Sequence, residues 1–184
     1  MYKTERYSAD VTVDKILKNY VNVEHFIEFC KNCGEYNKNW SCPEHDFDPK
    51  TIWSKYNKFH IVAIKIVFDD VLADKEFTPE EISKILKDSI ELERTQLEKR
   101  MRDLEHALPE SMALSAGSCN LCGKNDCKKI SGKPCCHPKQ MRYSIESLGG
   151  NVSEITKDFW GIDIKWIEDG KLPEYFTLVC GLLM

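Results

Sequence analysis

The stretch FHIVAIKIVF, residues 59–68, decides the fold of this chain. It is apolar and rich in β-branched residues, it is too short for a free-standing helix, and two aspartates end it, so it predicts a largely buried strand. Residues 174–180 predict a terminal strand, and residues 111–117 predict a short one that leads into Cys119. The pattern therefore predicts an α/β protein of the α+β type, with a mainly antiparallel sheet packed by helices.

Two helical segments are expected to pack against this sheet. Residues 13–30 carry apolar side chains at steps of three and four, with an interruption expected near Asn22. Residues 79–108 form the longest predicted helix, with Thr78 as its N-cap and a proline at the first helical position. The many charged residues between positions 91 and 105 are interpreted as a solvated helix face held by side-chain pairs.

A shorter helix is predicted over residues 138–148, stopped by Gly149 and Gly150. Arg142 and Glu146 would be one turn apart in that helix, so the sequence favours a local ion pair between them. No repeat or linker divides the chain, and we expect residues 1–184 to form a single domain.

Composition places the chain among globular proteins and argues against some functions. Apolar residues make up 42% and charged residues 30% of the 184 residues, and the formal net charge of -4 gives no basic footprint for nucleic acid. No stretch approaches the roughly 18 apolar residues of a membrane span, and no export signal follows Met1, so we expect a cytoplasmic protein without a membrane partner. Glycine-rich phosphate-binding loops and the His-Glu-x2-His zinc helix are both missing from the sequence.

The nine cysteines are the remaining evidence for function in the sequence, and eight of them form two tight groups. The ninth, Cys180, lies in an apolar run and is interpreted as a small core residue without a metal role. A reducing compartment disfavours structural disulfides, so clustered cysteines in segments of loop composition indicate soft-metal binding, usually zinc or iron-sulfur. The upstream group is Cys30, Cys33 and Cys42, and the downstream group is Cys119, Cys122, Cys127, Cys135 and the adjacent Cys136.

The two groups differ in how completely they could surround a metal centre. The downstream spacing of x2, x4 and x7 allows four thiolates from one short loop to converge. The upstream group has three cysteines, so a cluster held there would leave one iron for water, a substrate or an outside ligand such as His45 or Cys136. An open catalytic site and a closed structural or electron-transferring site both remain consistent with the sequence. We expect the two cysteine loops to meet on one side of the molecule.

Zinc and iron-sulfur make different use of these cysteines. Four-cysteine zinc sites usually combine two Cys-x2-Cys knuckles, which here would pair Cys30 and Cys33 with Cys119 and Cys122. That pairing leaves the other clustered cysteines without a ligand role, whereas a 4Fe-4S cluster in the downstream loop uses more of them. The sequence therefore favours one or two 4Fe-4S clusters, with zinc as the alternative.

Three separated motifs carry a resemblance to a known family. They are CKNCGEYNKNWSCP at 30–43, AGSCNLC at 116–122 and GKPCCHPKQMRYSIESLG at 132–149. In this order, and over nearly the whole chain, they resemble the prokaryotic cysteine-rich "predicted metal-binding protein" family, a domain of unknown function that is frequent in anaerobes. The resemblance implies no established reaction. It implies metal binding, as iron-sulfur, at Cys30, Cys33, Cys42, Cys119, Cys122, Cys127 and Cys135.

The chain departs from the family pattern at two positions. Glu44 stands where the family has a second proline, and Cys136 stands where the family usually has arginine. Cys136 is therefore interpreted as an extra thiol, a substitute ligand or a redox-sensitive neighbour of Cys135.

Three functional hypotheses follow from these observations. The first is a 4Fe-4S protein that transfers electrons, or serves as a redox accessory protein in anaerobic metabolism, together with a redox partner protein. The second is an enzyme whose three-cysteine cluster keeps an open iron for Lewis-acid or sulfur-transfer chemistry on a small-molecule substrate. The third is a zinc-stabilised interaction module.

Overall fold

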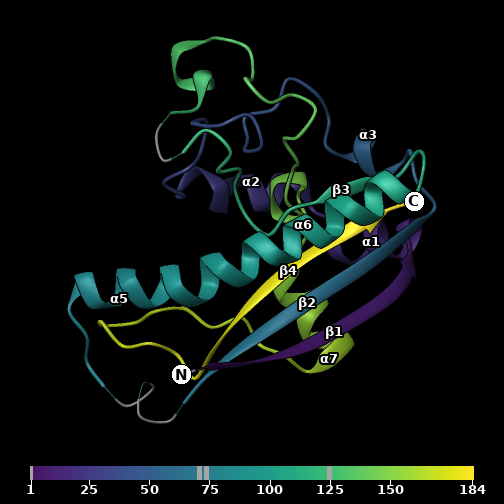
Figure 1. Cartoon of the computed structure of the whole chain (residues 1–184). Coiled ribbons are helices and arrows are strands. Elements are labelled where there is room, and N and C mark those ends of the chain that lie inside the picture. The colour runs from purple at the N-terminus through teal and green to yellow at the C-terminus, as the bar shows by residue number, and fades with distance from the viewer. Residues whose placement is uncertain (1, 70–71, 73–74, 124–125) are drawn as a thin grey trace.

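A four-stranded antiparallel sheet forms the centre of the computed structural model, which describes residues 2–69, 72, 75–123 and 126–184 (Figure 1). Its strands lie in the order β1-β2-β4-β3, and each neighbouring pair is antiparallel. The predicted α+β fold with a mainly antiparallel sheet is confirmed. The strands are β1 (Tyr2–Thr12), β2 (Lys58–Phe68), β3 (Met112–Leu114) and β4 (Tyr175–Leu183).

The central strand β2 buries side chains on both faces of the sheet, because β1 and β4 pair with its two edges and helices cover both faces. Its buried positions alternate until Ala63 and then change face at Ile64. Residues of the first half join one apolar cluster, and residues of the second half join another. The predicted strand at 59–68 is therefore confirmed, and its continuous apolar run reflects burial on two sides.

Strand β1 was not predicted from the sequence. Its stretch YKTERYSADVT alternates polar and apolar residues only weakly, and Val11 is its one buried residue. It nevertheless pairs with β2 from Tyr2 opposite Phe68 to Thr12 opposite Lys58. Charged side chains are tolerated here because β1 is an edge strand with one face partly in solvent.

Helices cover the two faces of the sheet in two layers (Figure 1). The long α5-α6 helix crosses one face, while α1 and α7 lie on the other. Both segments that carry the clustered cysteines lie together beyond α6, at the top of Figure 1. The elements of these layers are α1 (Val13–Tyr20), α2 (Val23–Lys31), α3 (Lys50–Trp53), α5 (Pro79–Leu86), the π-helical turn η1 (Lys87–Glu91), α6 (Leu92–Ala107) and α7 (Val152–Trp160).

Helix boundaries in the first half of the chain follow the predicted signals. Asn22 separates α1 from α2, and its side-chain oxygen accepts a hydrogen bond from the backbone N–H of His25 at 3.1 Å. Thr78 and Glu81 form a reciprocal capping box at the start of α5. The predicted interruption near Asn22 and the predicted long helix at 79–108 are thus confirmed.

The helix predicted over residues 138–148 is wrong. Only the 3-10 turns η2 (Lys128–Ser131) and η3 (Glu146–Leu148) form in this part of the chain. Between them the Arg142 side chain holds the backbone, since its Nη1 donates to the nearby carbonyls of Lys139 and Met141 at 2.9 and 2.7 Å while its Nη2 donates to Glu105 of α6 at 2.7 Å. Gly149 does end η3 in a left-handed conformation with φ of 81°, as the glycine signal predicted.

Among the described residues, no helix has both the length and the apolar character needed to cross a bilayer.

Candidate metal centre

The two cysteine segments contact each other directly, which confirms the expectation that they meet. The backbone N–H of Cys119 donates to Ser41 Oγ at 2.9 Å, and Trp40 Nε1 donates to the Lys133 carbonyl at 3.2 Å. Lys129 Nζ donates to the Cys42 carbonyl at 2.9 Å. These bonds join residues 40–42, at the end of the upstream cysteine segment, to Cys119, Lys129 and Lys133 at the start, middle and end of the downstream segment.

The upstream cysteines lie on a tight succession of turns that begins at the end of α2. Cys30 is in the last turn of α2, and its carbonyl accepts a hydrogen bond from the Cys33 N–H at 2.9 Å. The Cys42 N–H donates to the Asn39 carbonyl at 3.2 Å. Burial first, and then the neighbouring Cys33, Cys42 and Glu146, raise the pKa of the Cys30 thiol to about 11. The three thiols therefore lie close enough to interact electrostatically.

The downstream cysteines line one narrow cavity. Cys135 faces this cavity, whereas the adjacent Cys136 is exposed and is not among the residues that line it. Gly123, which has a positive φ of 81°, follows Cys122 directly, and its N–H donates to the Asn120 carbonyl at 3.0 Å, which closes the turn that carries Cys122. The lining residues are Trp40, Cys119, Leu121, Cys122, Gly123, Cys127, Cys135, His137 and Met141.

The electrostatics of this cavity favour a bound cation. Burial raises the pKa of Cys119, and the nearby Cys135 and Cys127 raise it again. The pKa of Cys122 is also raised, by burial first and then by the neighbouring thiols. A metal centre reverses this effect, because its positive charge stabilises thiolates that otherwise repel one another. The backbone N–H of His137 also donates a hydrogen bond to Cys135 Sγ at 3.4 Å.

The four cysteine sulfurs have the chemistry of ligands for a thiolate-bound metal centre. The distances between these sulfurs bear on whether a single ion or a larger centre would fit among them. Among the residues that the structure describes, no three His, Cys, Asp or Glu side chains are gathered so that they could hold a single metal ion. Tetrahedral zinc with bonds of about 2.3 Å would need its sulfurs to lie roughly 3.7 Å apart. Here the four thiols surround a cavity and do not converge on a point. All nine cysteines are free thiols.

A family model described as "Predicted metal-binding protein (DUF2284)", a family of unknown function, matches residues 16–184. The chain belongs to this family. The three cysteine motifs and the two loops described above lie inside the matched region. No curated protein and no solved structure matches the chain. Metal binding by members of this family thus agrees with the thiol-lined cavity, while the kind of metal is not part of the family description.

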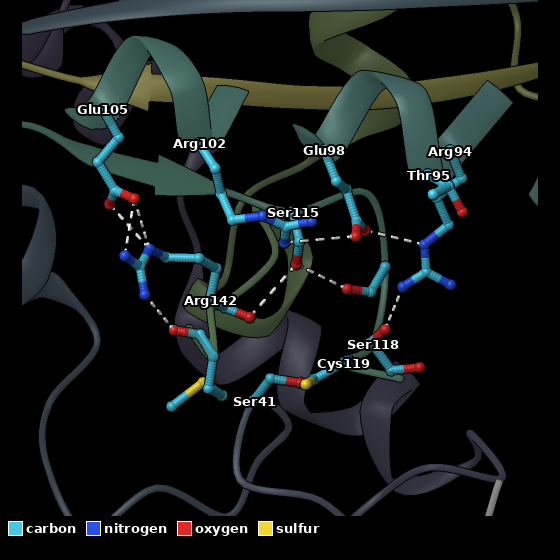
Figure 2. A network of polar contacts seen from close by, with 12 residues as sticks. Ser41, Arg94, Thr95, Glu98, Arg102, Glu105, Ser115, Ser118, Cys119 and Arg142 are labelled. Carbon is cyan, nitrogen blue, oxygen red and sulfur yellow. Dashed lines mark hydrogen bonds and ion pairs between the residues drawn. The ribbon is translucent and has the colours of Figure 1, made fainter. Parts of the chain in front are cut away.

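Helix α6 fixes the start of the downstream loop through an arginine (Figure 2). Arg94 Nε donates to Glu98 Oε1 at 2.9 Å, and its Nη2 donates to the carbonyl of Ser118, the residue before Cys119. The side chains of Arg94 and Glu98 are only 13% and 11% exposed. The interpretation of all the charged residues of this helix as a solvated face is therefore wrong, because part of that face packs against the cysteine loop.

A second arginine fixes the end of the downstream loop (Figure 2). Arg142 Nε and Nη2 donate to the two carboxylate oxygens of Glu105 on α6, at 2.8 and 2.7 Å. Glu105 Oε1 also accepts a hydrogen bond from the Ala113 N–H of β3 at 2.9 Å. The predicted local pair between Arg142 and Glu146 is wrong, since the segment is not helical and the arginine instead reaches across to α6.

Ser41 was missed by the sequence reasoning. It is 1% exposed, and its hydroxyl donates to Asn39 Oδ1 at 2.6 Å while it accepts from the Cys119 N–H. A serine between an aromatic residue and a cysteine in a polar loop carries no signal of its own. The partner that gives it a role is distant in sequence and becomes adjacent only in the folded chain.

The two residues proposed to complete the three-cysteine site lie in different places. His45 Nε2 donates to the Ser147 carbonyl at 3.0 Å, and its ring stacks on Phe47 at a centroid distance of 4.8 Å. His45 and Cys30 line the same pocket. Cys136 is exposed and interacts electrostatically with Cys122 of the downstream loop.

Proposed function

We propose that this protein binds a 4Fe-4S cluster at Cys119, Cys122, Cys127 and Cys135 and transfers electrons as a redox accessory protein of anaerobic metabolism. The observation that carries the proposal is the single cavity lined by these four thiols and by no carboxylate among the described residues. Thiolates are the donors that iron-sulfur clusters use, whereas carboxylates suit harder metals. Cys30, Cys33 and Cys42 would hold a second cluster.

A 4Fe-4S cluster accepts and releases one electron at a time, and its potential depends on hydrogen bonds and solvent access. The residues around the cavity supply both influences. Trp40, Leu121 and Met141 form apolar walls that keep water away, and the His137 N–H points at one sulfur. Arg94 and Ser41 bind the carbonyl and the N–H of the peptide group between Ser118 and Cys119, so that the Cys119 sulfur would keep its position when the charge of the site changes.

An electron carrier also needs a surface at which a redox partner protein docks near its cluster. Phe29, which precedes Cys30, is 60% exposed, and Ile130 in η2 is 55% exposed. Exposed apolar side chains beside both cysteine segments support a transient docking surface there. The proposed setting is the reducing cytoplasm, in which free thiols persist as metal ligands.

The experiment that tests this proposal is the analysis of iron, acid-labile sulfide and zinc in anaerobically purified protein, with visible and electron-spin-resonance spectra. The matched variants are Cys135→Ala and Cys136→Ala, because the two thiols are adjacent and only Cys135 lines the cavity. We expect Cys135→Ala to lose the iron and sulfide of one cluster and Cys136→Ala to retain both. Cys180→Ala, which changes a buried core thiol, should also retain them.

Two results would overturn the proposal. Stoichiometric zinc without sulfide would replace it with the zinc-stabilised module, and Cys122→Ser should then lower zinc content and folding stability together. Equal metal content in the Cys135→Ala and Cys136→Ala variants would refute the assignment of ligands.

A second candidate function is favoured by the pocket of about 280 Å³ that Cys30 lines. If the three upstream cysteines hold a cluster beside this pocket, a small-molecule substrate could approach it, and the protein would be an enzyme with Lewis-acid or sulfur-transfer chemistry. A spin-resonance spectrum of the reduced protein that changes when a small molecule is added would support this candidate over a pure electron carrier.

A further inference from the structure

A pocket of about 280 Å³ lies between α2, the segment after Cys42 and the turn η3. Its apolar wall consists of Val23, Phe26, Ile27, Pro43, Phe47 and Pro49, and Cys30 opens onto it from the last turn of α2. The size is at the lower end of small-molecule sites in proteins, which suits a compact ligand.

The walls of the pocket are held in place by contacts that do not involve any metal. The Asn22 N–H before α2 donates to the Gly149 carbonyl at 2.9 Å, directly after η3. Trp53 Nε1 donates to the Leu148 carbonyl of η3 at 3.1 Å, and Trp53 is fully buried. The pocket is therefore a preformed part of the fold.

A glutamate at the wall of this pocket has one carboxyl oxygen without a hydrogen-bond partner among the described residues. Glu146 lines the pocket, and its Oε2 atom is buried and accepts no hydrogen bond from any residue that the structure describes. Burial of a polar atom without a hydrogen bond costs about 1–3 kcal/mol, and more when the group is charged. Burial raises the pKa of the Glu146 carboxyl, whereas its own backbone N–H, the Ser144 side chain and Arg94 act in the opposite direction, so a cation beside this carboxyl would favour its charged form. The Arg94 guanidinium already donates to Glu98 and to the Ser118 carbonyl.

The other polar groups of the pocket are also acceptors. His45 Nε2 donates to the Ser147 carbonyl, so the neutral ring presents Nδ1 as an acceptor. Glu44 adds a second carboxylate, which already accepts from the Tyr36 hydroxyl at 3.0 Å, and the Ser147 hydroxyl donates to the Ser144 carbonyl. No lysine or arginine is among the described residues that line the pocket. A ligand must therefore bring hydrogen-bond donors, and an anion would be repelled.

We propose that this pocket binds a small organic ammonium ion, whose N–H groups donate to Glu146 Oε2 and whose apolar body packs against Phe26 and Phe47. Charge-assisted hydrogen bonds to a carboxylate in a water-poor site are among the stronger polar contacts, and aromatic rings attract an adjacent cation. The bound amine would lie beside Cys30. The inference goes beyond the proposed electron transfer, and it rests on the pocket and not on the presence of iron.

The test uses benzylamine as the probe on the full chain, purified anaerobically with whatever metal it carries. Benzyl alcohol and benzoate are the neutral and anionic comparators. By titration calorimetry we expect saturable binding of benzylamine and at least about tenfold weaker binding of both comparators. Iron and sulfide are measured in the same samples, so a failure of amine binding and a failure of the iron-sulfur proposal can be told apart.

Two variants and one control locate the binding. Glu146→Gln keeps the shape of the side chain and should weaken benzylamine binding by at least about tenfold, because the charge at the acceptor is lost. Ile27→Trp fills the pocket without changing the carboxylate and should also weaken it. Glu154→Gln changes an exposed carboxylate on α7 and should leave the affinity as in the wild type.

Three outcomes would overturn the proposal. They are the absence of saturable benzylamine binding to the wild type, equal affinity for benzylamine and benzyl alcohol, or an unchanged affinity in Glu146→Gln that circular dichroism shows to be folded. If Glu146→Gln does not fold, the comparison of the three probes and the Ile27→Trp variant decide the question by themselves.

Discussion

Replacement of Glu105 by glutamine tests whether α6 holds the downstream cysteine loop through Arg142 (Figure 2). The Arg142 and Glu105 side chains are 17% and 9% exposed, with Nη2 to Oε2 at 2.7 Å, so the pair is largely withdrawn from water. Glutamine keeps an acceptor for the Ala113 N–H but leaves the guanidinium without a counter-charge.

The magnitude follows from this geometry. Removal of one partner from a buried ion pair costs about 3–5 kcal/mol. Arg142 keeps its bonds to the carbonyls of Lys139 and Met141 and some contact with water, so we expect a smaller cost than this, about 2–3 kcal/mol in the free energy of unfolding. For a domain of this size that corresponds to a fall of roughly 4–12 °C in the melting temperature.

The assay is urea unfolding followed by circular dichroism on Glu105→Gln and on a matched control, Asp103→Asn. Asp103 is on the same helix and pairs with Lys99 at the same distance of 2.7 Å, but the two side chains are 60% and 73% exposed. Exposed pairs contribute about 0–1 kcal/mol, so the control should change stability little. The Glu105→Gln variant should also release its bound metal to a chelator faster than the control does. If the two variants unfold at the same urea concentration, the reasoning is refuted.

Three further changes test other parts of the structure. Ser41→Ala should lower the free energy of unfolding by about 1–3 kcal/mol and speed the loss of metal to a chelator, because it leaves the Cys119 N–H without its acceptor. The control Ser54→Ala removes a hydroxyl that bonds only within its own turn and should not speed metal loss. Equal rates of metal loss in the two variants would contradict this. Gly181→Ala should cost about 1–3 kcal/mol in urea unfolding, since an added Cβ would lie 2.3 Å from the Phe59 ring, and an unchanged midpoint would refute the packing. Burial lowers the pKa of His45 from 6.5, so the unfolded chain binds a proton at a higher pH than the folded chain does, and the free energy of unfolding falls as the pH drops below about 6.5. His45→Gln should therefore reduce the dependence of the free energy of unfolding on pH between about pH 7 and 5. The same pH dependence in variant and wild type would exclude the effect.

The sheet and the long helices were predictable because local pattern and burial agree there. The apolar run at 59–68 predicts β2, and Thr78, Pro79 and the helical spacing after them predict α5 and α6. Strand β1 escaped prediction because most of its burial comes from pairing with β2, which its own charged sequence does not reveal. The helix predicted at 138–148 failed for the related reason that Arg142 is held by partners on α6 and in its own loop.

The cysteine positions by themselves determined that two groups of thiols exist and that they suit a soft metal, because ligand chemistry is a property of the residue type. Only the tertiary structure decided which of them share a cavity, since that requires Ser41, Arg94 and Arg142 to join segments far apart in sequence. The same holds for Glu146, whose sequence neighbours suggest an ordinary surface ion pair. Burial near Cys30 leaves the Glu146 Oε2 atom without a hydrogen-bond partner among the described residues, and burial is fixed by the packing of distant segments around a residue.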